Sequence, residues 1–121
     1  MILADTHVLV WLTQRNRRLP ASAHDALLDS AFAVSVVTAY EYSDLQMRGR
    51  LRDAPPFDVL SLGLDFTLLP LPLDVWRFAK SLPDIHRDPV DRMLVAHAIA
   101  IDATLATNDA KMRAYPVKTL W

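Results

Sequence analysis

Short aliphatic segments alternate with longer segments of helical periodicity along the whole chain. The short segments are residues 1–4, 33–37, 66–69, 104–106 and 117–120. The β-branched run at 33–37 is typical of a strand that is covered on both faces. Right-handed crossovers between such strands place the connecting helices on the two faces of a parallel sheet. We therefore predict an α/β fold, a three-layer α/β/α sandwich with a central, mainly parallel five-stranded sheet.

The segments between these strands carry the start and stop signals of helices. Helices are predicted at residues 6–14, 22–29, 38–48, 55–64, 72–82 and 89–101, with one more short helix before the last strand. Thr38 and Glu41 fit a capping box that would place Glu41 at the third helical position. Gly49 then stops that helix at its C-terminal end. In the helix from residue 89, apolar positions repeat at three- and four-residue intervals, which indicates one buried face.

Length and composition narrow the class of protein. The 121 residues fit a single domain, residues 1–121, and 52% hydrophobic residues with only 2 glycines argue against disorder. The chain has no cysteine, which excludes disulfides and thiolate metal sites and is compatible with a reducing cytosol. The N-terminus reaches Asp5 too soon for a signal peptide, and no apolar run approaches the roughly 18 residues of a membrane span. A soluble cytoplasmic protein without membrane contact is expected.

The net charge gives no general attraction to nucleic acid. Lys and Arg number 13 against 14 Asp and Glu, so the formal charge is −1. A polyanion would have to be held by a metal ion or by local basic groups. Three such groups of arginines occur, namely Arg15, Arg17 and Arg18; Arg48, Arg50 and Arg52; and Arg87 and Arg92. The alternative for each group is a solvated arginine surface.

Four carboxylates fall where a predicted strand ends or the next predicted helix begins: Asp5, Glu41, Asp91 and Asp109. The carboxyl ends of parallel strands meet at one edge of the sheet, so these side chains are expected to lie together. Clustered carboxylates repel one another unless a hard cation lies among them, and oxygen ligands suit Mg²⁺. The sequence thus predicts a magnesium site, with Asp5 and Asp91 as direct ligands and Glu41 and Asp109 completing the set.

Each acid also has a purely structural explanation. Asp5 could cap the helix from residue 6, Glu41 could belong to the capping box, and Asp109 could form an Asx-turn. Asp88 before Pro89 is an expected N-cap, which places Asp91 in the first helical turn, where acids complement the helix dipole. Helix capping does not require four acids at one edge of one sheet, so the joint pattern favours the metal site.

Other kinds of site find no support in the sequence. His7, His24, His86 and His97 lack the spacing of a histidine metal site, and His97 lies in an apolar stripe, as a satisfied core imidazole would. There is no glycine-rich phosphate loop and no serine in a nucleophile elbow. A phospho-acceptor signalling domain would require paired acids after the first strand, whereas Thr6 follows Asp5.

Several sequence blocks resemble PIN-domain ribonucleases, in particular toxins of the VapC type. The similar blocks are residues 2–11, 34–41, 49–51, 86–96, 107–109 and 117–121, in the family's order and over the whole chain. The most specific block is Arg87-Asp88-Pro89-Val90-Asp91-Arg92. Two departures from the family pattern are Tyr40 in place of a usual tryptophan and Val90 in place of a common phenylalanine, both conservative packing changes.

The resemblance implies a Mg²⁺- or Mn²⁺-dependent endoribonuclease that leaves 5′-phosphate and 3′-hydroxyl ends. A cognate antitoxin would inhibit the enzyme by placing its tail in the acidic groove. Asp5, Glu41, Asp91 and Asp109 match the family's acidic positions, and Asp88 belongs to the subgroup motif as an outer support. Residues expected to bind substrate or to orient ligands are Thr6, Thr107, Asn108, Arg87 and Arg92.

Two further expectations concern catalysis and association. The main alternative is a catalytically silent PIN-fold module that binds RNA or protein, although such a module would be expected to lack one or more of the four acids. The apolar composition and the three tryptophans, Trp11, Trp76 and Trp121, favour a homodimer, the commonest soluble assembly.

Overall fold

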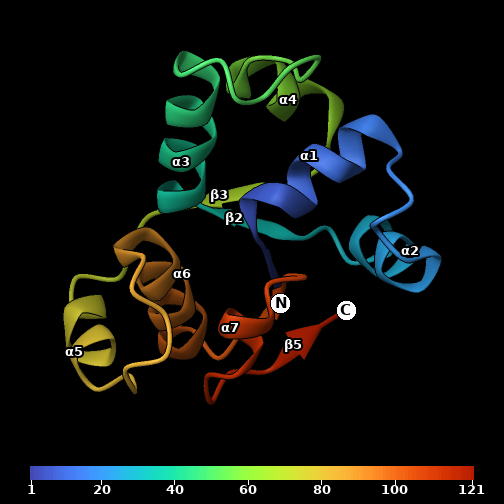
Figure 1. Ribbon diagram of the computed structural model, residues 1–121. Coiled ribbons are helices and arrows are strands. Elements are labelled where there is room, and N and C mark those ends of the chain that lie inside the picture. Colours follow the sequence, from blue (N-terminus) through green and yellow to red (C-terminus); the bar gives the residue numbers. More distant parts are fainter.

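The computed structural model describes residues 1–121 and contains one five-stranded sheet (Figure 1). Its strands are β1 (Ile2–Ala4), β2 (Ala33–Ser35), β3 (Thr67–Leu69), β4 (Thr104–Ala106) and β5 (Thr119–Leu120). They lie in the order β3-β2-β1-β4-β5, and all four pairings are parallel. The predicted five-stranded, mainly parallel sheet is confirmed, and every strand pair in it is parallel.

Helices cover both faces of this sheet (Figure 1). They are α1 (Thr6–Gln14), α2 (Ala21–Asp29), α3 (Val36–Met47), α4 (Phe57–Gly63), α5 (Val75–Lys80), α6 (Pro89–Ala100) and α7 (Ala110–Arg113). One apolar cluster joins the sheet to α1, α2 and α4, and the other joins it to α6 and α7. The predicted three-layer sandwich is therefore confirmed. No helix has the length and apolar character needed to cross a membrane.

The three central strands, β1, β2 and β4, are largely apolar because both of their faces are buried. Successive side chains of a strand point to opposite faces. Ala4, Val34 and Ala106 accordingly belong to the cluster beside α1, while Leu3, Ala33 and Leu105 belong to the cluster beside α6. The register pairs Leu3 with Ala33 on one side and with Leu105 on the other. This alternation explains the unbroken apolar runs in the sequence.

The boundary between β2 and α3 differs from the prediction. The strand ends at Ser35, and the helix begins at Val36 rather than at Thr38. Ser35 caps the helix, because its Oγ accepts a hydrogen bond of 3.1 Å from the Val37 amide. The predicted capping box is thus wrong, and Glu41 lies in the second turn of α3. No helix-capping role then explains this acid.

Helix α5 is shorter than the predicted range 72–82. Residues 72–74 form a turn in which the Val75 amide donates to the Pro72 carbonyl at 3.0 Å. The ends of the other elements agree with the prediction to within two residues, which is the usual uncertainty of element boundaries.

The stripe of α6 is buried as predicted, with one polar exception. His97 is 1% exposed, and its Nδ1 lies 2.8 Å from Ser35 Oγ. Its Nε2 is buried without a hydrogen-bond partner. Burial lowers the pKa of His97. The imidazole is therefore a core group, as predicted, but only one of its nitrogens is satisfied.

Candidate functional site

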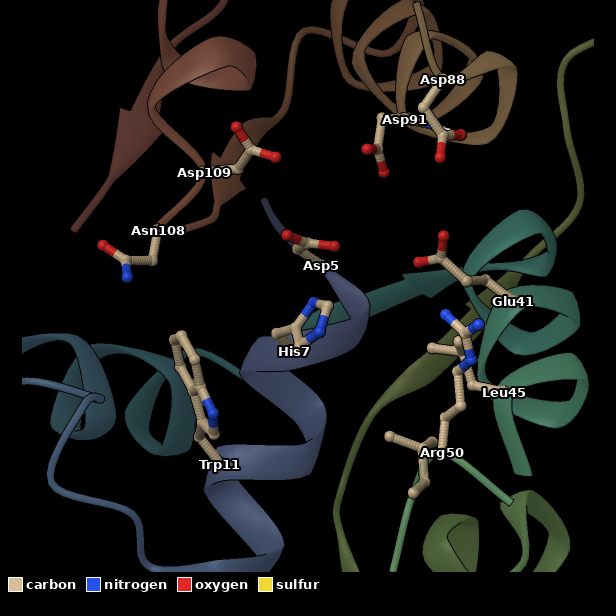
Figure 2. A pocket seen from close by; sticks show the side chains of 11 residues that line it. Asp5, His7, Trp11, Glu41, Leu45, Arg50, Asp88, Asp91, Asn108 and Asp109 are labelled. Atoms are coloured by element: carbon tan, nitrogen blue, oxygen red, sulfur yellow. Dashed lines mark hydrogen bonds between the residues drawn. The ribbon is translucent and has the colours of Figure 1, made fainter. Parts of the chain in front are cut away.

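A pocket of about 530 Å³ opens beyond the carboxyl ends of β1 and β4. The close view shows acidic side chains turned toward one another across it (Figure 2). The lining residues are Asp5, His7, Trp11, Glu41, Leu45, Arg50, Leu51, Asp88, Asp91, Asn108 and Asp109. All four predicted acids thus reach one pocket, although they come from α3, from α6 and from the residues that follow β1 and β4.

The pairing of β1 with β4 places Asp5 beside Thr107. Ala4 pairs with Ala106, and the Asp5 amide continues the ladder by donating to the Ala106 carbonyl at 3.0 Å. Thr107 Oγ1 donates to Asp5 Oδ2 at 2.8 Å, and the Thr6 amide donates to Asp5 Oδ1 at 2.6 Å. Asp5 is only 5% exposed, and this burial raises its pKa despite the hydrogen bond from Thr107. The carboxylate is held in a fixed position.

Glu41 reaches the pocket from α3, which packs against α1. Thr6, the first residue of α1, donates from its hydroxyl to Glu41 Oε1 at 2.5 Å. Burial raises the pKa of Glu41, the bond from Thr6 opposes that rise, and the negative charge of Asp5 adds to it. Thr6 and Thr107 thus each donate a side-chain hydrogen bond to one of the predicted metal ligands.

Asp88 and Asp91 both belong to the start of α6. Asp88 is the predicted N-cap, since its Oδ1 accepts from the Val90 amide at 2.8 Å and from the Asp91 amide at 3.3 Å. Asp91 lies in the first turn and faces Asp5 and Glu41. Burial, followed by the charges of these two acids, raises the pKa of Asp91 to about 8. At neutral pH the Asp91 carboxyl group therefore keeps a proton unless a cation is close.

Asp109 has two roles, one for each carboxylate oxygen. Its Oδ1 accepts from the amides of Lys111 at 2.8 Å and Met112 at 3.3 Å, so the predicted Asx-type bond forms and also caps α7. Its Oδ2 lies 3.3 Å from His86 Nε2. His86 also lies 2.9 Å from Asp91 Oδ2, which makes it a common neighbour of both acids.

The acids form two groups that share Asp91. Ligand atoms of Asp5, Glu41 and Asp91 lie within 4.8 Å of one another, and the same limit holds for His86, Asp91 and Asp109. The first group offers three carboxylates, the donor type that Mg²⁺ and Mn²⁺ prefer. Burial is the largest cause of the raised pKa values of its three members, and the negative charges of neighbouring acids add to the rise. These residues fit a hard divalent cation, whereas Asp109 belongs to the group with His86.

Of the other predicted site residues, Asn108 lies at the pocket, while Arg87 and Arg92 lie outside its lining. Asn108 is exposed and lines the pocket, and Arg87 is exposed. Arg92 binds the protein itself: Nη1 donates to the Pro83 carbonyl at 2.9 Å and to Tyr115 Oη at 3.2 Å, and Nη2 donates to the Ala79 carbonyl at 3.1 Å. This geometry assigns Arg92 to the support of the segment before α6, against its expected role as a phosphate contact.

Sequence reasoning missed His86 and the lining residues His7, Trp11, Leu45 and Leu51, and it named Arg50 only as one member of a basic group. His7 and Trp11 line one wall with ring centroids 6.1 Å apart, and Arg50 extends along the opposite wall toward Glu41 (Figure 2). His86 is two residues before the Asp88 cap, a position that could have signalled its proximity to Asp91. The i,i+4 spacing of His7 and Trp11 in α1 was a second available signal.

Comparisons with solved structures show where this fold occurs. The VapBC2 complex from Rickettsia felis, bound to a DNA fragment from its promoter, has a chain that matches with a TM-score of 0.73 and 19% identity over 99% of this chain and 98% of that one. The VapBC complex from Salmonella typhimurium, also DNA-bound, matches at 0.69 and 13%, covering 98% and 96%. A toxin–antitoxin complex from Klebsiella pneumoniae matches at 0.68 and 18%, covering 100% and 97%. At these identities the likeness establishes the shared fold.

Comparison with curated proteins finds no significant match. The model of the PIN domain family, by contrast, matches residues 2–118, which is nearly the whole chain. That range includes the four predicted acids of the pocket and every strand except β5, which begins at Thr119. The chain belongs to the PIN domain family.

Proposed function

We propose that this chain is a divalent-metal-dependent endoribonuclease toxin of the VapC type, which hydrolyses RNA phosphodiester bonds with Mg²⁺ or Mn²⁺. The observation that carries the proposal is the approach of Asp5, Glu41 and Asp91 to within 4.8 Å of one another in an open pocket. Family membership and the fold shared with toxin–antitoxin complexes support it. All four acids line the pocket, which favours an active enzyme over a catalytically silent PIN-fold binding module.

Some residues of the site would bind the metal ion, and others would orient those ligands through hydrogen bonds. Asp5, Glu41 and Asp91 would hold the ion, which when bound acts as a Lewis acid toward the phosphate and lowers the pKa of water. Thr107 and the Thr6 amide keep both oxygens of Asp5 in place, and the Thr6 hydroxyl keeps Glu41 in place. Such outer hydrogen bonds fix ligand geometry before substrate arrives. Asp91 keeps a proton that it must release when the ion binds.

The walls of the pocket suit a single strand of RNA. Arg50 is exposed on one wall and could pair with a phosphate, although the net charge of the whole chain is −1. The opposite wall carries the exposed His7 beside the largely buried Trp11, and an exposed histidine ring can stack on an unpaired base. Unpaired loops or tails of RNA are therefore the expected substrates in the cytoplasm.

The proposed partners are an antitoxin and a second copy of the chain. The acidic pocket favours a basic antitoxin segment that would exclude both the metal ion and RNA. Among the tryptophans expected at a dimer interface, Trp11 is 8% exposed and packs on Trp121 within the chain, with ring centroids 5.5 Å apart. Trp76, which is 53% exposed beside the fully exposed Leu73, remains available for association.

The test of this function is cleavage of a 5′-labelled single-stranded RNA by the purified protein in Mg²⁺, in Mn²⁺ and in chelator. Wild type is expected to cleave only with metal and to leave 5′-phosphate ends that RNA ligase accepts. Asp91→Asn is expected to abolish cleavage with an unchanged circular dichroism spectrum, and the exposed Asp65→Asn serves as the charge-matched control. Metal-independent cleavage, or full activity of folded Asp91→Asn, would contradict the proposal.

A further inference from the structure

His86 lies between Asp91, which would hold the metal ion, and Asp109, to which the proposed reaction gives no role. Its Nε2 is 2.9 Å from Asp91 Oδ2 and 3.3 Å from Asp109 Oδ2. The side chain is 15% exposed, comparable to the 16% of Asp91. An imidazole in this place can act in two ways: it can ligate a second metal ion through a nitrogen lone pair, or it can donate a hydrogen bond to both acids.

The other ring nitrogen decides between these two roles. His86 Nδ1 lies 3.2 Å from the backbone amide of Asp88, which donates to it. A backbone N–H can only donate, so Nδ1 must present its lone pair. In the neutral ring the proton is then on Nε2, the nitrogen that faces Asp91 and Asp109. A metal ion at Nε2 would require the proton to move to Nδ1, where it would face the Asp88 N–H.

The backbone of His86 is held independently of the ring. Its amide donates to Tyr115 Oη at 2.7 Å, and Arg92 Nη1 donates to the same hydroxyl at 3.2 Å. Arg92 also holds the carbonyls of Pro83 and Ala79, which lie before His86 in the chain. Contacts from α6, α5 and Tyr115 thus fix the segment that carries the imidazole. Turning the ring over would break the hydrogen bond from the Asp88 amide to Nδ1.

We propose that His86 is a positioning residue whose Nε2–H occupies the place between Asp91 and Asp109, so that the site holds one divalent cation, at Asp5, Glu41 and Asp91. A proton and a divalent cation cannot share the space between the same two oxygens, because they repel. The donation engages Asp91 Oδ2 and leaves its other oxygen to face Asp5 and Glu41. This inference rests on the proposed metal-dependent function and specifies how many ions that function uses.

The test is to count Mn²⁺ ions at one fixed pH, by calorimetric titration and by electron paramagnetic resonance of free Mn²⁺. Wild type is expected to bind one ion per chain. His86→Gln keeps an N–H donor at about the same reach and is expected to bind one ion as well. His86→Ala removes the donor and is expected to bind a second, weaker ion at Asp91 and Asp109. His24→Ala is the matched control, because His24 also lies 3.3 Å from an aspartate, Asp25, outside the pocket.

The second readout is nitrogen coordination, measured on bound Mn²⁺ by pulsed electron paramagnetic resonance. No ¹⁴N coupling that depends on His86 is expected, so the spectra of wild type and His86→Gln should agree. Three results would each overturn the inference. They are two bound ions in wild type, a nitrogen coupling that is present in wild type and lost in His86→Gln, and a single bound ion in folded His86→Ala. Zero ions in wild type would refute the metal-dependent function itself, and the one-ion inference with it. The two failures are therefore distinguishable.

Discussion

The Thr6 hydroxyl links the first residue of α1 to the second turn of α3 by donating to Glu41 Oε1 at 2.5 Å. The amide of the same residue donates to Asp5 Oδ1. One threonine therefore orients two carboxylates that are 36 residues apart in the sequence. Because Thr6 is fully buried, its position depends on the packing of α1 and not on solvent.

Replacing Thr6 by valine should weaken metal binding while preserving the fold. Valine has nearly the same shape but no hydroxyl, so Glu41 loses a hydrogen bond that lowers its pKa and fixes its orientation. Loss of an outer hydrogen bond of this kind costs roughly 10–100-fold in metal affinity. Titration with Mn²⁺ measures the effect, and Thr13→Val, which loses a bond to the Val10 carbonyl instead, is the control. Equal affinities in both variants would show that the Thr6–Glu41 bond does not support the metal site.

Replacing Arg50 by glutamine should weaken RNA binding and reduce its salt dependence. Arg50 lines the pocket and makes no ion pair, whereas neighbouring Arg48 pairs with Asp44 at 3.1 Å. For single-stranded nucleic acid, the logarithm of the binding constant falls linearly with the logarithm of the salt concentration. Each lost phosphate contact reduces the steepness of this slope by about 0.7. The measurement is RNA affinity over a range of salt concentrations for the inactive Asp91→Asn protein with and without the change. An unchanged slope would show that Arg50 is a solvated surface residue without a phosphate contact. The same measurement after replacement of Arg15, Arg17 and Arg18 tests whether that group contacts phosphates.

Arg92 and Arg87 should respond differently to the same substitution. Arg92→Gln loses contacts with two carbonyls and the Tyr115 hydroxyl, so a decrease of about 1–3 kcal/mol in the free energy of unfolding is expected. Arg87→Gln removes an exposed side chain and should change that free energy by less than about 0.5 kcal/mol. Urea denaturation of the two variants measures both values. Equal stabilities would contradict the structural role of Arg92.

The order of strands and helices could be predicted from the sequence because buried parallel strands are apolar on both faces. The boundary at Ser35 could not, since Val36 and Val37 favour a strand by residue type. The hydroxyl of Ser35 caps α3 and outweighs that preference by starting the helix two residues earlier. This shift removes the capping-box explanation of Glu41 and leaves its predicted place in the pocket.

The four acids could be predicted because strand ends and helix starts converge at one edge of a parallel sheet. The contacts of His86 and Arg92 could not be predicted, because they depend on the fold of the segment between α5 and α6. Tyr115, which is 29 residues after His86 and 23 after Arg92, contacts both of them. Such a contact leaves no periodic pattern in the sequence.

Metal binding should release protons, and metal affinity should rise with pH between about 6 and 8. The Asp91 carboxyl group has its pKa raised to about 8, so it is largely protonated at pH 7 and must lose its proton when a cation binds. Calorimetry of Mn²⁺ binding in two buffers of different ionisation enthalpy counts the released protons. A heat of binding that is independent of the buffer would contradict this coupling.

Without metal, the stability of the wild type should fall as the pH rises from 7 to 8.5. The folded-state pKa of Asp91 lies near 8, whereas its unfolded value is 3.8, so the folded state binds more protons between these pH values. The free energy of unfolding then decreases as the pH rises through this window, and the whole contribution is lost above the folded pKa. The raised pKa values of Asp5 and Glu41 act in the same direction.

The Asp91→Asn variant separates the effect of Asp91 on the pH dependence of stability from the effect of the buried imidazole of His97. Burial lowers the pKa of His97 below its ordinary 6.5, so His97 destabilises the fold only when the pH falls below that value. Between pH 7 and 8.5 the Asp91 carboxyl group should titrate while His97 stays neutral, so the variant should show a smaller loss of Tm than wild type in chelator. Asp65→Asn should follow wild type.

Mn²⁺ in a hundredfold excess over its Kd should add about 2.7 kcal/mol to the free energy of unfolding of wild type and much less to that of Asp91→Asn. If both proteins lost Tm equally with rising pH and gained equally from metal, Asp91 would be only a first-turn acid that supports α6.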